Sequence, residues 1–349
     1  MPTIHTVKPG ESLSVIAANY GFRSWRAIYD HVSNAELRKK RPNPQVIGVG
    51  DEIVIPDKAR KNVLARTGQT HAYAAASAKL RLEFTLTVVD ELNPIEPIPD
   101  LTVTLKTPNG KDVVLRTDSI GEISLGEPQI SAGVVDVIDV WDTRDPAHIR
   151  YKSYAKIGLA TNQCHQLHIP DKRKIINRIA SALKIKRRLA WGSKKPKYAD
   201  MEEDWHFHTI VIHHSGNGGA KDPKEIEREH MVDNDWEDVG YHYLIVPSGD
   251  IYEGRCLAYK GTHVLNANTG KIGVLIMGDF EHQWWDDDDD PTVSQLSAAE
   301  SLVKTLKKEF ATMTNLGGHR DYKIGTECPG GELYARLDGL RTSTGLGGP

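Results

Sequence analysis

The alternation of hydrophobic and polar positions divides the first half of the chain into three segments. Residues 1–57 read as strand, helix, helix and strand, ending in the apolar run Ile53-Val54-Ile55 before a proline. Residues 58–79 are rich in alanine and polar side chains without an apolar period, which predicts a linker. Residues 80–170 alternate over several short runs and contain an Asn109-Gly110 turn, so we expect a small β-sandwich that serves as a spacer or adaptor.

The second half begins with a basic segment at residues 171–203. Between residues 172 and 197 the sequence has eleven Lys or Arg and no acidic residue, with isoleucines and leucines at helical spacing. Such a pattern fits a basic amphipathic helix for an anionic surface, or a linker helix that packs its apolar stripe on a neighbouring domain; we favour the linker helix.

The last domain is expected at residues 204–342. Thr209 to Ile212 are β-branched and predict a buried strand. Helices are expected to begin at Pro223 and near Pro291, where proline suits the first helical turn. The predicted fold class is therefore multidomain α/β, with a small β-α-α-β module, a β-sandwich and a C-terminal domain whose mixed central sheet is flanked by helices.

Composition excludes several classes of function. The 44 basic and 47 acidic residues give a net charge of −3, which offers no case for nucleic-acid binding. No apolar run approaches the roughly 18–20 residues of a membrane span, and the N-terminus lacks the pattern of a secretory signal. Three cysteines are too few, and odd in number, for a disulfide scaffold.

Candidate chemistry gathers in the last domain. His213 and His214 end the predicted strand, and His319 precedes Cys328 by a loop short enough to fold back. One histidine of the pair, His319 and Cys328 would supply three nitrogen and sulfur ligands, the set that catalytic zinc uses together with water. The residues alone leave a second interpretation open, in which the cysteine is buried and free and the histidines are scattered.

A tryptophan pair and an acidic run form a loop before the last helices. Trp284 and Trp285 can stack on sugar or pack the loop, and the residues do not decide between these roles. Asp286 to Asp290 lack the alternating ligand spacing of an EF-hand, so we expect a solvated loop at a helix N-terminus.

The N-terminal segment resembles the LysM module. Its opening residues, Thr6 to Leu13, and its closing residues, Gly50 to Pro56, are similar to the two hallmark motifs of that family. The resemblance implies binding of N-acetylglucosamine-containing glycans such as peptidoglycan or chitin. The basic insert at residues 34–44 leaves a second possibility, a structural module that docks on another protein.

The last domain resembles the zinc-dependent N-acetylmuramoyl-L-alanine amidases, which include phage lysozyme-type amidases and peptidoglycan-recognition proteins. The resemblance extends from about residue 205 to 335 and rests on blocks in family order. These blocks are Ile210 to Ser215, Val239 to Ile245, Gly249 to Arg255, Gly261 to His263, Ile272 to Val274, Gly318 to Asp321 and Cys328 to Gly330.

This resemblance implies a role for each matching residue. The implied Zn²⁺ ligands are His213, His319 and Cys328. The implied catalytic residues are Tyr241 and Thr326, the latter at a position where the phage enzymes have a lysine. The candidates for substrate binding are His263, Arg255 and His214; a structural hydrogen bond or ion pair is the alternative role for His263 and Arg255, and packing for His214.

The function implied is hydrolysis of the amide bond between N-acetylmuramic acid and L-alanine in peptidoglycan. The alternatives are a peptidoglycan-recognition protein without catalysis and a phage-type endolysin. Because the cell wall lies outside the cytoplasm and no signal is visible, we expect synthesis in the cytoplasm and action in the periplasm or at the wall, after lysis or after export by a secretion apparatus such as type VI. An antibacterial effector of that kind would have an immunity protein as a partner.

Overall fold

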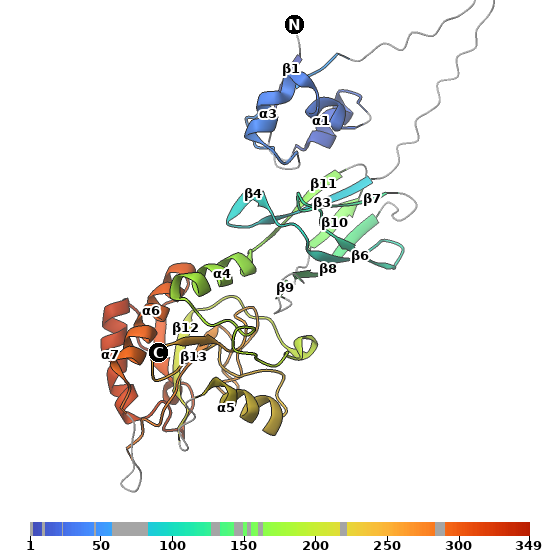
Figure 1. The fold of residues 1–349 in the computed structure, drawn as a ribbon. Coiled ribbons are helices and arrows are strands. Elements are labelled where there is room, and N and C mark those ends of the chain that lie inside the picture. Colours follow the sequence, from blue (N-terminus) through green and yellow to red (C-terminus); the bar gives the residue numbers. More distant parts are fainter. Residues whose placement is uncertain are drawn as a thin grey trace, which may run out of the picture. The chain divides into compact units, whose positions relative to one another are not determined.

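The computed structural model describes residues 3–8, 11–22, 24–44, 47–57, 83–126, 133–142, 149–151, 155–159, 163–216, 222–282 and 290–349. The predicted linker at 58–79 lies outside these ranges, as do Trp284, Trp285 and most of the acidic run that follows them. The chain divides into two compact units, Met1–Arg144 with Tyr151–Asp171, and Asp145–Arg150 with Lys172–Pro349. Each is described by itself (Figure 1).

The N-terminal module has its own apolar core beneath a two-stranded antiparallel sheet. Its elements are β1 (Thr3–Thr6), α1 (Leu13–Asn19), α2 (Arg26–Tyr29), η1 (Val32–Asn34), α3 (Ala35–Lys40) and β2 (Glu52–Ile55). Relative to the predicted strand–helix–helix–strand order, the structure adds η1 and α3, which occupy most of the basic insert. The Arg38 guanidinium donates hydrogen bonds to the carbonyls of Tyr29 and His31 and so holds α3 in place.

The middle region consists of β-strands, as its alternation predicts. They are β3 (Glu83–Asp90), β4 (Asn93–Pro97), β5 (Thr102–Lys106), β6 (Asp112–Arg116), β7 (Glu122–Gly126), β8 (Gly133–Asp142), β9 (Ile149–Tyr151), β10 (Ala155–Leu159) and β11 (Gln163–Ile169). One sheet contains the order β10-β8-β5-β6 and another β11-β3-β4, with β7 also on β3. Alternate residues such as Leu86, Val88, Val103 and Leu105 are fully buried. The packing of the two sheets as a sandwich stays a prediction.

The second unit is built on a five-stranded sheet of order β14-β13-β15-β12-β16. Its strands are β12 (Thr209–His214), β13 (Tyr243–Ile245), β14 (Ile251–Glu253), β15 (Lys271–Ile276) and β16 (Asn315–Gly318). All neighbouring pairs are parallel except β13 with β14, so the sheet is mixed, in agreement with the predicted fold class.

Helices surround this sheet. They are α4 (Lys172–Leu183), η2 (Tyr198–Asp200), α5 (Pro223–Arg228), η3 (Glu229–Asp233), α6 (Val293–Glu309), η4 (His319–Asp321) and α7 (Gly331–Thr344). Both predicted helix starts are close to the observed ones. Asp222 caps α5 by accepting a hydrogen bond from the Lys224 amide, and Thr292 caps α6 in a reciprocal capping box with Gln295. No helix in the described part of the chain has the length and apolarity that a membrane crossing requires.

The two faces of the sheet have different roles. Ile212 and Ile276 contribute to an apolar wall shared with α6 and α7, which lie together in orange and red in Figure 1. Leu275, the next residue of β15, belongs instead to a buried cluster with Ile226 of α5. Because successive side chains of a strand point to opposite faces, His213, which pairs with Leu275 in register, lies on the α5 face.

Candidate metal centre and active site

Three side chains converge at the carboxyl ends of two parallel strands. His213 is near the end of β12, and His319 begins η4 directly after β16, the strand that pairs with β12 in register. Cys328 comes from the loop before α7. One ligand atom from each residue lies within 4.8 Å of the other two, so the group can hold a metal ion. The structure thus brings together the three residues that the sequence nominated as ligands.

The chemistry of this group fits zinc. His213 is fully buried, and its Nδ1 lies 3.6 Å from the Cys328 sulfur. The buried Nε2 of His319 has no hydrogen-bond partner among the described residues. Burial lowers the pKa of His319 to about 4 and lowers that of His213 as well, so both imidazoles are neutral at pH 7, as ligands must be. Burial raises the pKa of Cys328 to about 12, so a thiolate there requires a neighbouring cation.

His263 supports the first ligand. Its Nδ1 lies 2.9 Å from Nε2 of His213, the ring nitrogen on the side away from the cysteine contact. The His263 ring lies against Gly261 and Gly273, where an added Cβ would come within 2.4 Å and 2.5 Å of it. Glycine at both positions therefore leaves room for the ring. A partner on the second nitrogen of a ligating histidine fixes its tautomer and orientation.

Tyr241 lies beside the three ligand side chains. The centre of its ring is 5.0 Å from that of His213. Burial, and then the neighbouring Cys328, raise the pKa of this phenol, so the hydroxyl keeps its proton and can donate it in a hydrogen bond. Thr326 belongs to the ligand loop: its hydroxyl oxygen accepts a hydrogen bond of 3.2 Å from the Cys328 amide.

A pocket of about 660 Å³ opens at this group. Tyr241, His263 and His319 line it, and further walls come from η3, from residues 260–269 and from Lys323. The pocket therefore reaches the ligand group at His319. Its lining includes both cationic and anionic side chains, at Lys260, Lys323 and Glu229.

Two residues nominated for substrate contact lie elsewhere. Arg255 is 3% exposed, and its guanidinium donates to the carbonyls of Val239 and Lys260, at 2.8 and 2.7 Å. These contacts favour its structural alternative. The Nδ1 of His214 accepts a hydrogen bond of 3.3 Å from the Phe280 amide, which agrees with packing. Neither residue is among the described residues that line the pocket.

Two features of the site were not predicted from the sequence. One is the contact between the rings of His263 and His213, and the other is the pairing of the basic segment after α4 with acidic residues of this unit. The first had a signal, because His263 falls in a motif of the resembling family. The second had none, because the acidic partners of the segment are distant in sequence, as at Glu253 and Asp238.

Comparison with known proteins identifies the C-terminal unit. The profile of the family described as N-acetylmuramoyl-L-alanine amidase matches residues 204–331. Peptidoglycan-recognition protein SD of Drosophila simulans is 30% identical over 159 residues, which cover 43% of this chain and 82% of that protein. Peptidoglycan-recognition protein LB of Drosophila melanogaster is 29% identical over 161 residues, 42% of this chain but only 64% of that protein.

Among solved structures, the chain is similar to the crystal structure of Drosophila peptidoglycan-recognition protein SD. It is 28% identical, with a TM-score of 0.39, and the match covers 44% of this chain and 92% of that one. The profile match and the curated relatives decide the assignment: through residues 204–331, the chain belongs to the N-acetylmuramoyl-L-alanine amidase family, to which the peptidoglycan-recognition proteins are related.

Proposed function

We propose that this protein is a zinc-dependent amidase that hydrolyses the bond between N-acetylmuramic acid and L-alanine in peptidoglycan. The observation that carries the proposal is the convergence of His213, His319 and Cys328 within 4.8 Å, beside a 660 Å³ pocket that His319 lines. The amidase profile and relatives named for peptidoglycan recognition support the choice of substrate.

We assign a separate chemical role to the three ligand residues, to Tyr241 and to Thr326. His213, His319 and Cys328 would hold a zinc ion, which when bound polarises a carbonyl and supplies a nucleophilic water at neutral pH. Tyr241 keeps its proton and donates a hydrogen bond to the carbonyl oxygen as negative charge develops there. Thr326 offers a second hydroxyl, while its oxygen holds the cysteine loop in shape.

Digestion of purified peptidoglycan tests the proposal. We expect new L-alanine amino termini without new reducing sugars, loss of this activity with a chelator and its return with zinc. H319A should be inactive, while H206A, which alters an exposed histidine, serves as the control. Cleavage that survives complete metal removal, or that persists undiminished in H319A, contradicts the mechanism. A zinc-loaded protein that binds peptidoglycan without cutting it would be a recognition protein instead.

The N-terminal module is proposed as a LysM-type anchor for glycan. It has a core of its own, including Leu13, Ile16 and Ile28, so it can act as a separate binding unit. A weak glycan site tethered to a catalytic domain raises the local concentration of substrate. Deleting residues 1–57 should reduce sedimentation with wall sacks. Unchanged sedimentation would reject the anchor and favour docking on a protein.

We further propose delivery to the wall as an antibacterial effector, with a secretion-apparatus component and an immunity protein as partners. The proposal is motivated by the combination of a module that resembles LysM, a β-domain and the amidase family match in one chain. Expression directed to the periplasm should kill cells, and a small protein encoded beside this one should protect them. Killing that no neighbouring protein relieves would favour the endolysin alternative.

A further inference from the structure

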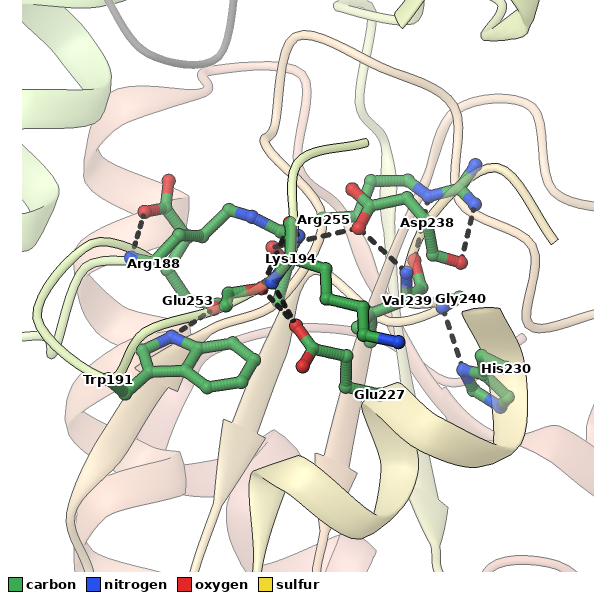
Figure 2. A network of polar contacts seen from close by, with 12 residues as sticks. Arg188, Trp191, Lys194, Glu227, His230, Asp238, Val239, Gly240, Glu253 and Arg255 are labelled. Atoms are coloured by element: carbon green, nitrogen blue, oxygen red, sulfur yellow. Dashed lines mark hydrogen bonds and ion pairs between the residues drawn. The ribbon is translucent and has the colours of Figure 1, made fainter. Parts of the chain in front are cut away.

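The basic segment that follows α4 is part of the amidase unit. Residues 184–197, called the strap below, precede the family match at 204–331 but pack on β14 and α5. The Arg187 guanidinium donates to Glu253 at 2.7 Å, and the Trp191 indole donates to the Glu253 carbonyl at 3.0 Å. Figure 2 shows the Trp191–Glu253 contact together with those of Arg188, Glu227 and Asp238, which are described next.

A second anchor fixes the end of the strap to α5. The carboxylate of Glu227, 2% exposed, accepts hydrogen bonds from the Ser193 hydroxyl at 2.5 Å and from the Lys194 amide at 2.6 Å. The Lys224 ammonium lies 2.8 Å from the other oxygen of the same carboxylate. The strap is therefore held at two points by buried acidic residues of the amidase unit, Glu253 and Glu227.

Between these anchors Arg188 reaches Asp238. Its Nη1 lies 2.8 Å from a carboxylate oxygen of Asp238, and the side chains are 10% and 1% exposed. The same guanidinium donates to the carbonyls of Gly254 and Lys194, so its geometry is fixed from several sides. A buried carboxylate that loses its partner is strongly destabilised, so the position of Asp238 depends on the strap.

Asp238 begins the segment that carries Tyr241. Its carboxylate accepts the Val239 amide at 2.8 Å, and the Gly240 amide donates to the His230 ring at 3.0 Å. The Gly240 carbonyl accepts the Thr262 amide at 2.9 Å. A Cβ on Gly240 would lie 2.3 Å from the Thr262 carbonyl oxygen, so the two backbones are in close contact here.

Arg255 completes the support from the other side. Its guanidinium donates to the Val239 carbonyl, and its backbone amide donates to the Tyr241 carbonyl at 2.7 Å. A change at Asp238 is therefore transmitted along three residues of fixed backbone to a ring that lies 5.0 Å from His213.

We propose that Arg188 and Asp238 are positioning residues for Tyr241, and that the catalytic unit begins at the strap rather than at the start of the family match. The inference rests on the proposed amidase function for its kinetic effect. It adds that an element outside the matched region sets the geometry of a catalytic residue. The three ligand residues come from other segments, so zinc binding is independent of the strap.

The test uses the full chain with zinc bound and compares R188M with the wild-type protein. Because misplacement of a catalytic group by about 1 Å can cost 10²-fold, we expect kcat to fall roughly 10- to 100-fold while KM and zinc affinity stay unchanged. In a Y241F background the same R188M change should have no further effect on kcat. The peptide covering residues 238–242 should exchange its amide hydrogens faster in R188M.

The control is K197M, which removes an ion pair of the same strap. Lys197 lies 2.7 Å from Asp235, but the two side chains are 47% and 86% exposed, so we expect wild-type kcat and exchange. R188M/D238N, which removes both buried charges, should fold but keep the low kcat, because the contact that holds the start of the segment is missing in it as well. It replaces R188M in the test if R188M alone does not fold.

The outcomes separate the two proposals. A wild-type protein that binds zinc but cuts no peptidoglycan rejects the amidase function, and exchange at 238–242 then still reports whether Arg188 orders the segment. An active wild type with R188M equal to K197M in kcat and exchange overturns the positioning role. An equal loss of kcat in the wild-type and Y241F backgrounds overturns it as well, because the effect would not pass through Tyr241.

Discussion

Removing the partner of a metal ligand tests how the centre is held. In the H263A variant, Nε2 of His213 loses the nitrogen that lies 2.9 Å away, while all three ligand residues stay intact. With Nδ1 of His213 as the proposed zinc ligand, Nε2 must carry the ring proton, and in H263A it becomes a buried donor without an acceptor. Such a donor costs about 1–3 kcal/mol, and loss of a partner of this kind typically weakens metal affinity by roughly 10- to 100-fold.

The assay is competition for zinc with a fluorescent chelator at pH 7. H263N, whose side-chain oxygen can accept a hydrogen bond near the position of Nδ1, should retain most of the affinity that H263A loses. H206A alters an exposed histidine and should bind zinc like the wild type. The reasoning is refuted if H263A and the wild type have the same affinity. If H263N is as weak as H263A, the packing of the ring matters rather than its hydrogen bond.

Three further predictions concern stability. Buried Asp51 is paired with two basic side chains, which hold its pKa at about 2 against an ordinary 3.8. Because folding lowers this pKa, the charged Asp51 should add about 2 kcal/mol to the free energy of unfolding of the N-terminal module above pH 4, and this contribution should be lost as the pH falls toward 2. D51N should abolish this pH dependence, as measured by amide exchange of the module. G240A, which places Cβ 2.3 Å from the Thr262 carbonyl oxygen, should cost about 1–3 kcal/mol in denaturant unfolding of the amidase unit. T292A removes one half of the capping box with Gln295 and should cost about 1 kcal/mol in the same measurement, with unchanged zinc affinity.

Local sequence patterns were sufficient to predict the strands and helices, but not the tertiary contacts between them. The β-branched run Thr209–Ile212 predicted a buried strand, and β12 covers it; Pro223 predicted the start of α5. The closeness of His213 to His319 follows from the pairing of β12 with β16, which no local period encodes. The residues alone left two interpretations of His213, His319 and Cys328 open, and the resemblance to a family favoured the one in which they share a metal ion.

The strap shows why a local charge count misleads. Eleven bases without an acid predicted a linker helix, yet only residues 172–183 form the helix α4, and the following bases pair with acids of the amidase unit. Those acids, Glu253 and Asp238, lie more than forty residues further along the chain. Several bases of the segment thus find acidic partners only in the fold, so a local excess of charge is no evidence that the segment is a solvated linker.

Glycine, rather than any charged group, sets how closely the parts of the centre approach one another. Gly261 and Gly273 lie against the ring of His263. Gly240, the residue before Tyr241, lies against the carbonyl of Thr262. Each of these glycines falls in one of the short motifs that carry the family resemblance, beside a histidine, a tyrosine or a strand. The motifs therefore specify close packing as much as chemistry. Ligand residues grafted onto another sheet without these glycines would lack the contact that orients His213, even with all three ligands in place.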